Sequence, residues 1–186
     1  MPDPYFPLAE GVGWIYAETG PVVQRIFKIR VEPQVELEVE DLVTHAVRPR
    51  RAWVLREEDA PTPIYAAAGE EGIEFFRERH LSAPERQAVV LKQDLRWAGE
   101  SSWSVPFLHY SLRMQQYRRA GEEDVLVPAG RFRCLKILAD DGETGAVWLA
   151  PGVGIVREAF LVDGLDRDRY CVVDLCATPA DVRRRA

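Results

Sequence analysis

Alternation of apolar and polar residues with a period of two recurs along this sequence, and it constrains the fold more than any other feature. In the stretch VELEVE, Val35, Leu37 and Val39 alternate with glutamates, so one face of the segment is apolar and the other is acidic. Side chains two apart on one face of a strand point outward separately, so the glutamates are expected to form a solvated face and not a cation site. Because sustained helical spacing is scarce, the pattern predicts a mainly β protein.

Breaks between the alternating stretches indicate where the expected strands end. The Gly-Pro pair at Gly20 separates WIYAET from RIFKIRV, and Gly121 separates LRMQQYRRA from EDVLVP. The alternating stretch VELEVEDLVTHAV is expected to be a further long strand. Counted in this way, the chain contains about ten strands.

Two dipeptides in the last third of the chain are typical of hairpin turns. Asp141-Gly142 and Asp163-Gly164 accept the positive φ angles that tight two-residue turns require. Consecutive hairpins predict an antiparallel meander in this part of the chain.

About ten strands in one flat sheet would expose a whole apolar face to water. The sequence therefore predicts a curved antiparallel sheet, arranged as a half-barrel, a barrel-like fold or a sandwich, with at most one or two short helices. The assignment of residues 83–92 stays open between helix and strand. Ser82 and Glu85 have the spacing of a capping box, whereas Val89 and Val90 lower the helix propensity.

Length and composition are those of one ordinary globular domain. The 186 residues show no linker, and 47% of them are hydrophobic and 29% charged, so we expect residues 1–186 to form a single β domain. The net charge of −6 argues against nonspecific nucleic-acid binding, because phosphate neutralisation requires a clustered excess of Lys and Arg.

The hydropathy pattern also bears on location. No apolar run approaches the roughly 20 residues that cross a bilayer. The opening stretch MPDPYFPLAEG has neither the cationic region nor the apolar region of a secretory signal. The chain as written is therefore expected in the cytoplasm, and in the cell envelope if the natural protein carries an upstream signal.

Two elbows rich in Gly and Pro have the chemistry of chain corners. In VPAGRF, Pro128 cannot donate to a strand partner and Gly130 accepts a positive φ. In APGVGIV, Pro151 ends a strand, and Gly152 and Gly154 allow a tight turn or a bulge. We expect all five residues to be structural corners. The alternative is an anion-binding site made of backbone N–H groups. It is less favoured, because no helix follows whose dipole would strengthen anion binding.

These elbows belong to a set of motifs that resembles a family of uncharacterised bacterial β-sheet proteins. Its members begin with Tyr-Phe-Pro-Leu, a Gly and Trp-x-Tyr, and carry Val-Pro-Ala-Gly-x-Phe before Trp-x-Ala-Pro-Gly-x-Gly. The resemblance covers about the first 16 residues and roughly residues 115–160. The matching residues are Tyr5, Phe6, Pro7, Leu8, Gly11, Trp14 and Tyr16; Val127, Pro128, Ala129, Gly130 and Phe132; and Trp148, Ala150, Pro151, Gly152 and Gly154.

This resemblance implies an antiparallel β domain of a kind that is often exported or lipid-anchored. Its members are similar in outline to the periplasmic lipoprotein-carrier proteins, whose half-barrel sheet wraps a hydrophobic cavity. The family brings no established activity with it. The sequence as written shows neither a leader nor a lipobox cysteine, so the cell-envelope location implied by the resemblance is expected only with an upstream signal.

The sequence contains none of the common catalytic or cofactor motifs. It has no Gly-x-Ser-x-Gly elbow, no His-Glu-x-x-His helix and no phosphate-binding glycine loop. His45, His80 and His109 lie in three separate segments and are not expected to share a metal ion. No cofactor, metal site or catalytic residue is therefore predicted.

The chain has three cysteines, so one thiol stays unpaired however they combine. Cys171 and Cys176 lie five apart in an expected strand and point to opposite faces, so they cannot bridge within it. We expect small buried hydrophobes, with a disulfide from Cys134 to one of the others as the second interpretation. A reactive cysteine is the third.

Aromatic side chains supply more apolar area than the turns of this chain need. We expect them either to line a ligand cavity inside the curved sheet or to fill its core. The candidate cavity residues are Trp53, Phe75, Phe76, Trp97, Trp103, Phe107, Tyr110 and Trp148.

Three functional hypotheses follow from these observations. The first is a noncatalytic domain that binds a hydrophobic small molecule or lipid, or a protein partner, on a curved sheet, with the loop around residues 97–110 as its rim. The second is a structural or assembly module whose strand edges pair with a partner or with another copy, giving a homo-oligomer. The third is an enzyme whose His, Asp and Cys residues converge from distant segments, as Cys134 and His109 would.

Overall fold

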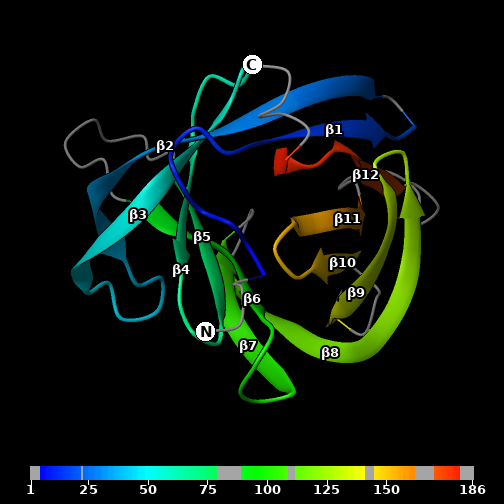
Figure 1. Cartoon of the computed structure of the whole chain (residues 1–186). Helices are drawn as coiled ribbons and strands as arrows, with labels where there is room; N and C mark the ends of the chain where they lie inside the picture. The colour runs from blue at the N-terminus through cyan, green and yellow to red at the C-terminus, as the bar shows by residue number, and fades with distance from the viewer. Residues whose placement is uncertain are drawn as a thin grey trace.

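The structure, a computed structural model, describes residues 5–21, 23–78, 89–108, 112–140, 145–161 and 170–180 (Figure 1). The secondary structure of this part of the chain is almost all strand, which confirms the mainly β prediction. The strands are β1 (Gly13–Thr19), β2 (Gln24–Glu40), β3 (Val47–Glu57), β4 (Ile64–Ala68), β5 (Gly72–Glu78), β6 (Val89–Arg96), β7 (Ser102–Leu108), β8 (Leu112–Val127), β9 (Gly130–Ala139), β10 (Gly145–Ala150), β11 (Gly154–Leu161) and β12 (Tyr170–Ala177).

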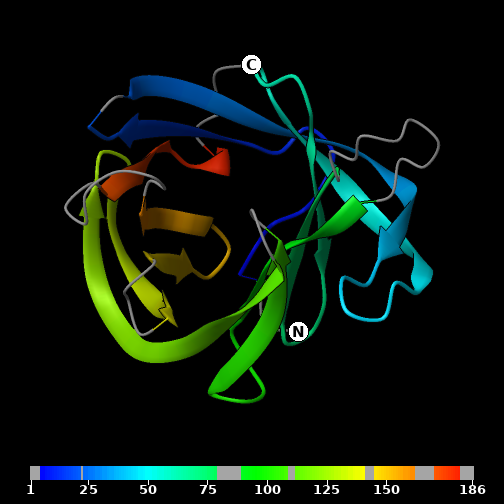
Figure 2. The ribbon, with the colours of Figure 1, turned by 180° about the vertical axis from the view of Figure 1, so that it is seen from behind.

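These strands form one curved mixed sheet that does not close into a barrel, as the front and back views show (Figures 1 and 2). The strand order is β3-β4-β5-β6-β2-β1-β12-β11-β10-β9-β8-β7. The pairings of this sheet are antiparallel except for a short parallel contact between β2 and β6, where Val39 lies opposite Val89. The curved sheet predicted from the alternation is confirmed, with twelve strands in place of about ten and with one parallel contact.

The expected meander in the last third is confirmed, because β8 to β12 pair antiparallel in sequence order. Leu161 of β11 lies opposite Tyr170 of β12, and residues 162–169 lie outside the described part of the chain. Both predicted turn dipeptides lie outside the described residues.

In the segment left open between helix and strand, residues 79–88 lie outside the described part of the chain. From Val89 onward the chain is strand β6. The predicted loop around residues 97–110 likewise contains a strand, β7, which pairs with β8 along its whole length.

Two predicted breaks lie inside continuous strands. RIFKIRV and VELEVE form the single strand β2, which continues through a register shift at Pro33 and ends at Glu40. Gly121, with a φ of 97°, marks a register shift within β8. A bulge places one extra residue opposite the partner and bends the strand, so both residues curve the sheet without interrupting it.

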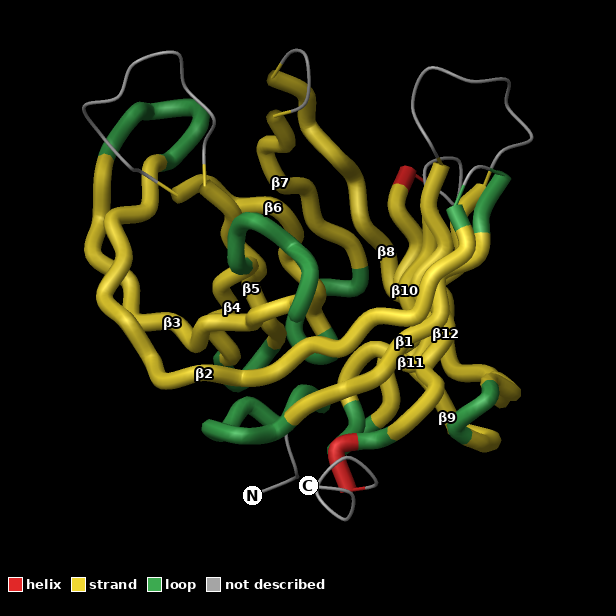
Figure 3. Tube along the Cα trace, turned by 90° about the horizontal axis from the view of Figure 1, so that it is seen from above, coloured by secondary structure: helices red, strands yellow, loops and turns green. Residues whose placement is uncertain are grey.

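The long strand β2 serves two parts of the sheet, and Figure 3 shows it running across the molecule from β1 toward β3. Its first half pairs with β1, whereas its second half pairs with β3 and touches β6. The pairings β2–β3, β3–β4, β4–β5, β5–β6 and β6–β2 therefore join into a small ring of strands. A separate cluster of buried residues accompanies this ring: Ala52, Ala67, Phe76 and Val89.

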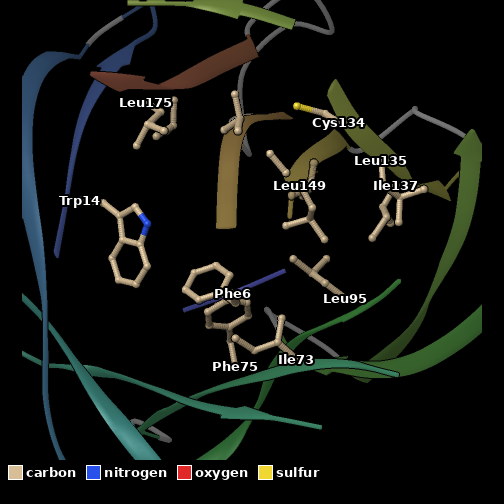
Figure 4. Close-up of a cluster of buried hydrophobic side chains, with 14 of the residues drawn as sticks. Phe6, Trp14, Ile73, Phe75, Leu95, Cys134, Leu135, Ile137, Leu149 and Leu175 are labelled. Atoms are coloured by element: carbon tan, nitrogen blue, oxygen red, sulfur yellow. The ribbon is translucent and has the colours of Figure 1, made fainter. Parts of the chain in front are cut away.

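The main core fills the inner side of the rest of the sheet, and Figure 4 shows its central side chains. The segment before β1 enters this space, where Phe6 is only 4% exposed. Its ring centroid lies 5.0 Å from that of Trp14 and 5.6 Å from that of Phe75. The curved sheet thus wraps around the segment that precedes β1.

Side chains, not a backbone ladder, connect β6 and β7 among the described residues. The indole nitrogen of Trp103 on β7 donates a hydrogen bond of 3.0 Å to the backbone carbonyl of Asp94 on β6. Trp103 also stacks on Tyr117, with ring centroids 5.7 Å apart. This indole therefore links β6 and β7, between which no strand pairing is found among the described residues.

We predict that Trp103→Phe lowers the free energy of unfolding by about 1–3 kcal/mol beyond the loss of packing, because the Asp94 carbonyl loses a buried partner. Trp53→Phe is the matched control, since the half-buried Trp53 makes no hydrogen bond through its indole to the described residues. Chemical denaturation of both variants measures the difference, and equal losses would contradict the assigned role of Trp103.

Candidate ligand pocket

A pocket of about 230 Å³ opens on the inner side of the sheet. Most of its lining is aromatic or aliphatic, with a smaller set of charged and amide side chains. The lining residues are Phe6, Trp14, Tyr16, Glu18, Arg25, Phe27, Ile29, Leu55, Glu57, Ala60, Thr62, Ile64, Phe75, Lys92, Gln93, Ile155, Glu158, Phe160 and Val173.

Strand alternation places the apolar lining. On β1, Trp14 and Tyr16 point inward, and on β2 Phe27 and Ile29 do the same because successive side chains of a strand face opposite sides. Phe6 adds a wall from outside the sheet. The stack of Tyr16 on Phe27, at 5.6 Å between ring centroids, joins the two strands on the pocket side.

Arg25 is compensated within the pocket. Its guanidinium contacts Glu18 at 2.7 Å and Glu57 at 2.5 Å, and it lies 4.7 Å from the centroid of the Phe27 ring. The hydrogen bond to Glu18 is the largest cause of the raised pKa of Arg25. This network joins β1, β2 and β3 and holds one positive charge against two carboxylates.

A second polar contact spans the pocket. The side-chain amide of Gln93 on β6 donates a hydrogen bond of 3.4 Å to Glu158 on β11. Burial, followed by the charge of Glu158, raises the pKa of Tyr16 and of Tyr117. Glu158 therefore acts on groups inside the curve of the sheet.

Two of the sequence motifs meet beside this pocket. The indole nitrogen of Trp14 donates a hydrogen bond of 2.6 Å to the carbonyl of Val153, and the hydroxyl of Tyr16 donates one of 3.0 Å to the carbonyl of Ile155. An added Cβ on Gly154 would lie 3.0 Å from the Phe6 ring. The opening motif thus holds the turn between β10 and β11 in place.

Of the residues expected at corners, Pro151 and Gly152 lie in that same turn. Gly152 has a φ of 69° and Gly154 a φ of 97°, both in the region that favours glycine. Pro128 lies in the turn between β8 and β9, and Gly130 has a φ of 134° at the start of β9. The positions are those of turns, and no anion-binding role is assigned to them.

The residues expected to line a cavity are dispersed. Phe75 lines the pocket, whereas Phe76 belongs to the small core of the ring and Trp103 to the main core. Trp53 and Trp97 are half-buried against the main core.

The other three residues of that set lie apart from this pocket or outside the description. Trp148 donates through its indole to Glu123 at 2.5 Å, and the Lys136 ammonium lies 4.9 Å from its ring centroid. The side chain of Phe107 and the whole of Tyr110 lie outside the described residues.

Sequence reasoning missed most of the aromatic residues that do line the pocket. Phe27 and Ile29 carry a usable signal, because they alternate in the stretch RIFKIRV. Phe6 was visible only as a member of a motif. Phe160 and Glu158 follow a bulge, so simple alternation does not assign their face.

The groups considered for catalysis are not brought together in the described part of the chain. Among the described residues, His, Cys, Asp and Glu side chains form no cluster suited to a metal ion. His45 lies 2.8 Å from Glu40, and His80 and His109 are outside the description. Cys134, Cys171 and Cys176 are all free thiols.

Cys134 is fully buried, and its burial raises the pKa of the thiol to about 11, with a further contribution from Glu123 and Asp124. We predict that alkylation of Cys134 at neutral pH is about a hundredfold slower in the folded protein than in denaturant, because the thiolate is the reacting form. Peptide mapping after timed alkylation reads each cysteine separately. A cysteine that reacts faster in the folded protein would revive the enzyme hypothesis.

Glycine is required at 154 for two reasons, the positive φ and the contact with Phe6. We predict that Gly154→Ala lowers the free energy of unfolding by more than the about 1–2 kcal/mol expected for an alanine at positive φ. Gly152→Ala is the matched control, because Gly152 also has a positive φ but an added Cβ meets nothing within 4 Å. Thermal and chemical denaturation compare the two, and an equal effect would contradict the Phe6 contact.

The fold defines a curved β-sheet domain with an inner pocket. The sequence matches no protein-family model, and no curated protein matches it. One similar solved structure is a "putative lipoprotein" from Parabacteroides distasonis, with a TM-score of 0.43, 12% identity and coverage of 96% of this chain and 99% of that chain. Another is a "putative exported protein with YmcC-like fold" from Bacteroides fragilis, with a TM-score of 0.46, 13% identity and coverage of 95% and 99%.

Membership of the family that the motifs resemble stays a prediction. Within the described residues, the structure has no helix with the length and apolar character needed to cross a membrane.

Proposed function

We propose that this protein is a noncatalytic binding domain that holds one small apolar ligand, or one apolar segment of a larger ligand, in the pocket inside the curved sheet. The pocket itself carries the proposal, because its largely aromatic and aliphatic lining surrounds a volume of about 230 Å³. Sites with a mostly apolar lining and a few placed polar groups are typical of small-molecule binding.

The size of the pocket limits the ligand. Pockets for drug-sized molecules have volumes of about 300–1,000 Å³, so this one suits a smaller body or a single hydrocarbon segment. The β3–β4 connection contributes Ala60 and Thr62 to the lining, and β6 contributes Lys92 and Gln93. The segment at 97–108, which includes β7, does not line the pocket.

Pairing through strand edges has less support. β7 is the end strand of the sheet and carries Pro106 opposite Met114 of β8. Proline has no N–H to offer a further strand, and it is one of the residues that blunt strand edges against pairing. The hypothesis of an assembly module therefore remains second to ligand binding.

The binding proposal is compatible with both locations considered from the sequence, the cytoplasm and the cell envelope. The cellular location stays a prediction. Extraction of the purified protein with organic solvent, followed by mass spectrometry, tests for a stoichiometric apolar ligand. Light scattering over a range of concentrations tests the assembly alternative, which requires a mass that rises with concentration.

A substitution that fills the pocket separates binding from folding. Val173 lines the pocket and is 9% exposed, whereas its neighbour Val172 lies on the other face of β12. We predict that Val173→Phe reduces binding of the neutral fluorophore N-phenyl-1-naphthylamine at least about tenfold, since the added ring occupies the pocket.

Val172→Phe is the matched control and is expected to keep the affinity of the native protein. Circular dichroism and thermal melting of both variants check that each is folded. Unchanged binding by a folded Val173→Phe variant would contradict the proposed site.

A further inference from the structure

The charges of the pocket do not all compensate one another. Arg25 is paired with Glu18 and Glu57, as described above. Two further ionisable side chains line the pocket, Lys92 on β6 and Glu158 on β11. They add one positive and one negative group to an apolar space that also holds the Arg25 network, in which two carboxylates share one guanidinium.

Lys92 reaches the pocket because of a bulge. In the pairing of β5 with β6, Phe75 lies opposite Gln93 and Phe76 opposite Leu91, so Lys92 is the extra residue. Bulges redirect side chains in this way, and here adjacent residues Lys92 and Gln93 both line the pocket. Lys92 as a residue is half-buried, and its ammonium makes no ion pair with a carboxylate of the described residues.

Glu158 reaches the pocket by the same device. Trp148 lies opposite Arg157 and Leu149 opposite Ile155, so the extra residue of β11 is Val156, and the alternation shifts between Ile155 and Glu158. Glu158 is half-buried and accepts the long 3.4 Å hydrogen bond from Gln93. Within the described part of the chain no cation pairs with it.

We propose that the pocket selects ligands whose polar head is zwitterionic, with an anionic group at Lys92 and a donor cation at Glu158, and whose body is a short apolar chain. This inference rests on the proposed function and adds the chemistry of the head group. Partly buried charges gain most from an oppositely charged, hydrogen-bonded partner, so a head that meets both is favoured. An anionic head group alone would leave Glu158 without a partner and be repelled by it. A cationic head group alone would leave Lys92 without a partner and be repelled by it.

Four ligands with the same number of carbon atoms separate head group from body. They are decanol, decanoate, decylammonium and α-aminodecanoate, which are neutral, anionic, cationic and zwitterionic at neutral pH. Each is titrated against the full chain loaded with N-phenyl-1-naphthylamine, below the concentration at which it forms micelles. We expect α-aminodecanoate to displace the fluorophore at a concentration at least about tenfold lower than decanol does.

Substitutions test whether Lys92 binds the anionic group of the ligand and Glu158 its cationic group. Lys92→Met is expected to make α-aminodecanoate displace the fluorophore no better than decylammonium does. Glu158→Gln is expected to make α-aminodecanoate displace it no better than decanoate does. Lys28→Met is the control, because Lys28 lies on β2 outside the pocket lining and pairs with Glu58 at 3.3 Å. It should leave the order of the four ligands unchanged.

The outcomes distinguish the two proposals. Displacement by all four ligands with equal strength, or a preference that survives Lys92→Met and Glu158→Gln, would overturn the zwitterion inference while leaving apolar binding intact. If the fluorophore does not bind, or none of the ligands displaces it from the folded native protein, the proposed function itself fails.

Discussion

The contact between the opening segment and the β10–β11 turn is the interaction on which the rest of the structure depends. The Trp14 indole donates to the Val153 carbonyl, and Phe6 lies against Gly154. The Trp14–Val153 hydrogen bond joins parts of the chain that are 139 positions apart in sequence. These contacts fix the distance between β1 and the β10–β11 turn, and therefore the space that remains between them. The pocket occupies part of that space, so its shape follows from this packing.

Bulges give the pocket its chemistry. A strand with strict alternation presents every second side chain to one face, and a single extra residue reverses that assignment from there on. The bulge at Lys92 turns two adjacent polar side chains toward the interior, and the bulge at Val156 turns Glu158 inward. A sheet without these irregularities would have an inner surface with fewer polar groups. The proposed selectivity for a head group thus depends on the two bulges of the backbone as much as on the identity of the side chains.

The sequence was sufficient for the fold class and insufficient for the pocket. Alternation predicted a curved β-sheet correctly, because burying one face of many strands leaves few other arrangements. The breaks at Gly121 and before VELEVE were wrong, because a glycine or proline flanked by continuous partner strands is accommodated as a bulge.

The pocket residues depend on strand partners that lie far away in sequence. Phe75 was among the expected cavity residues, but Tyr16 and Phe160 were not, because their facing is set by pairing with β2 and β12. The strand β2 is shared by the small ring and the main curve, so neither buried cluster can come apart without breaking hydrogen bonds along the same backbone. Separate hydrophobic nuclei in one chain usually behave as independent units of local opening. Here both clusters share the backbone of β2, so local opening at one end of this strand removes hydrogen bonds next to the other cluster as well.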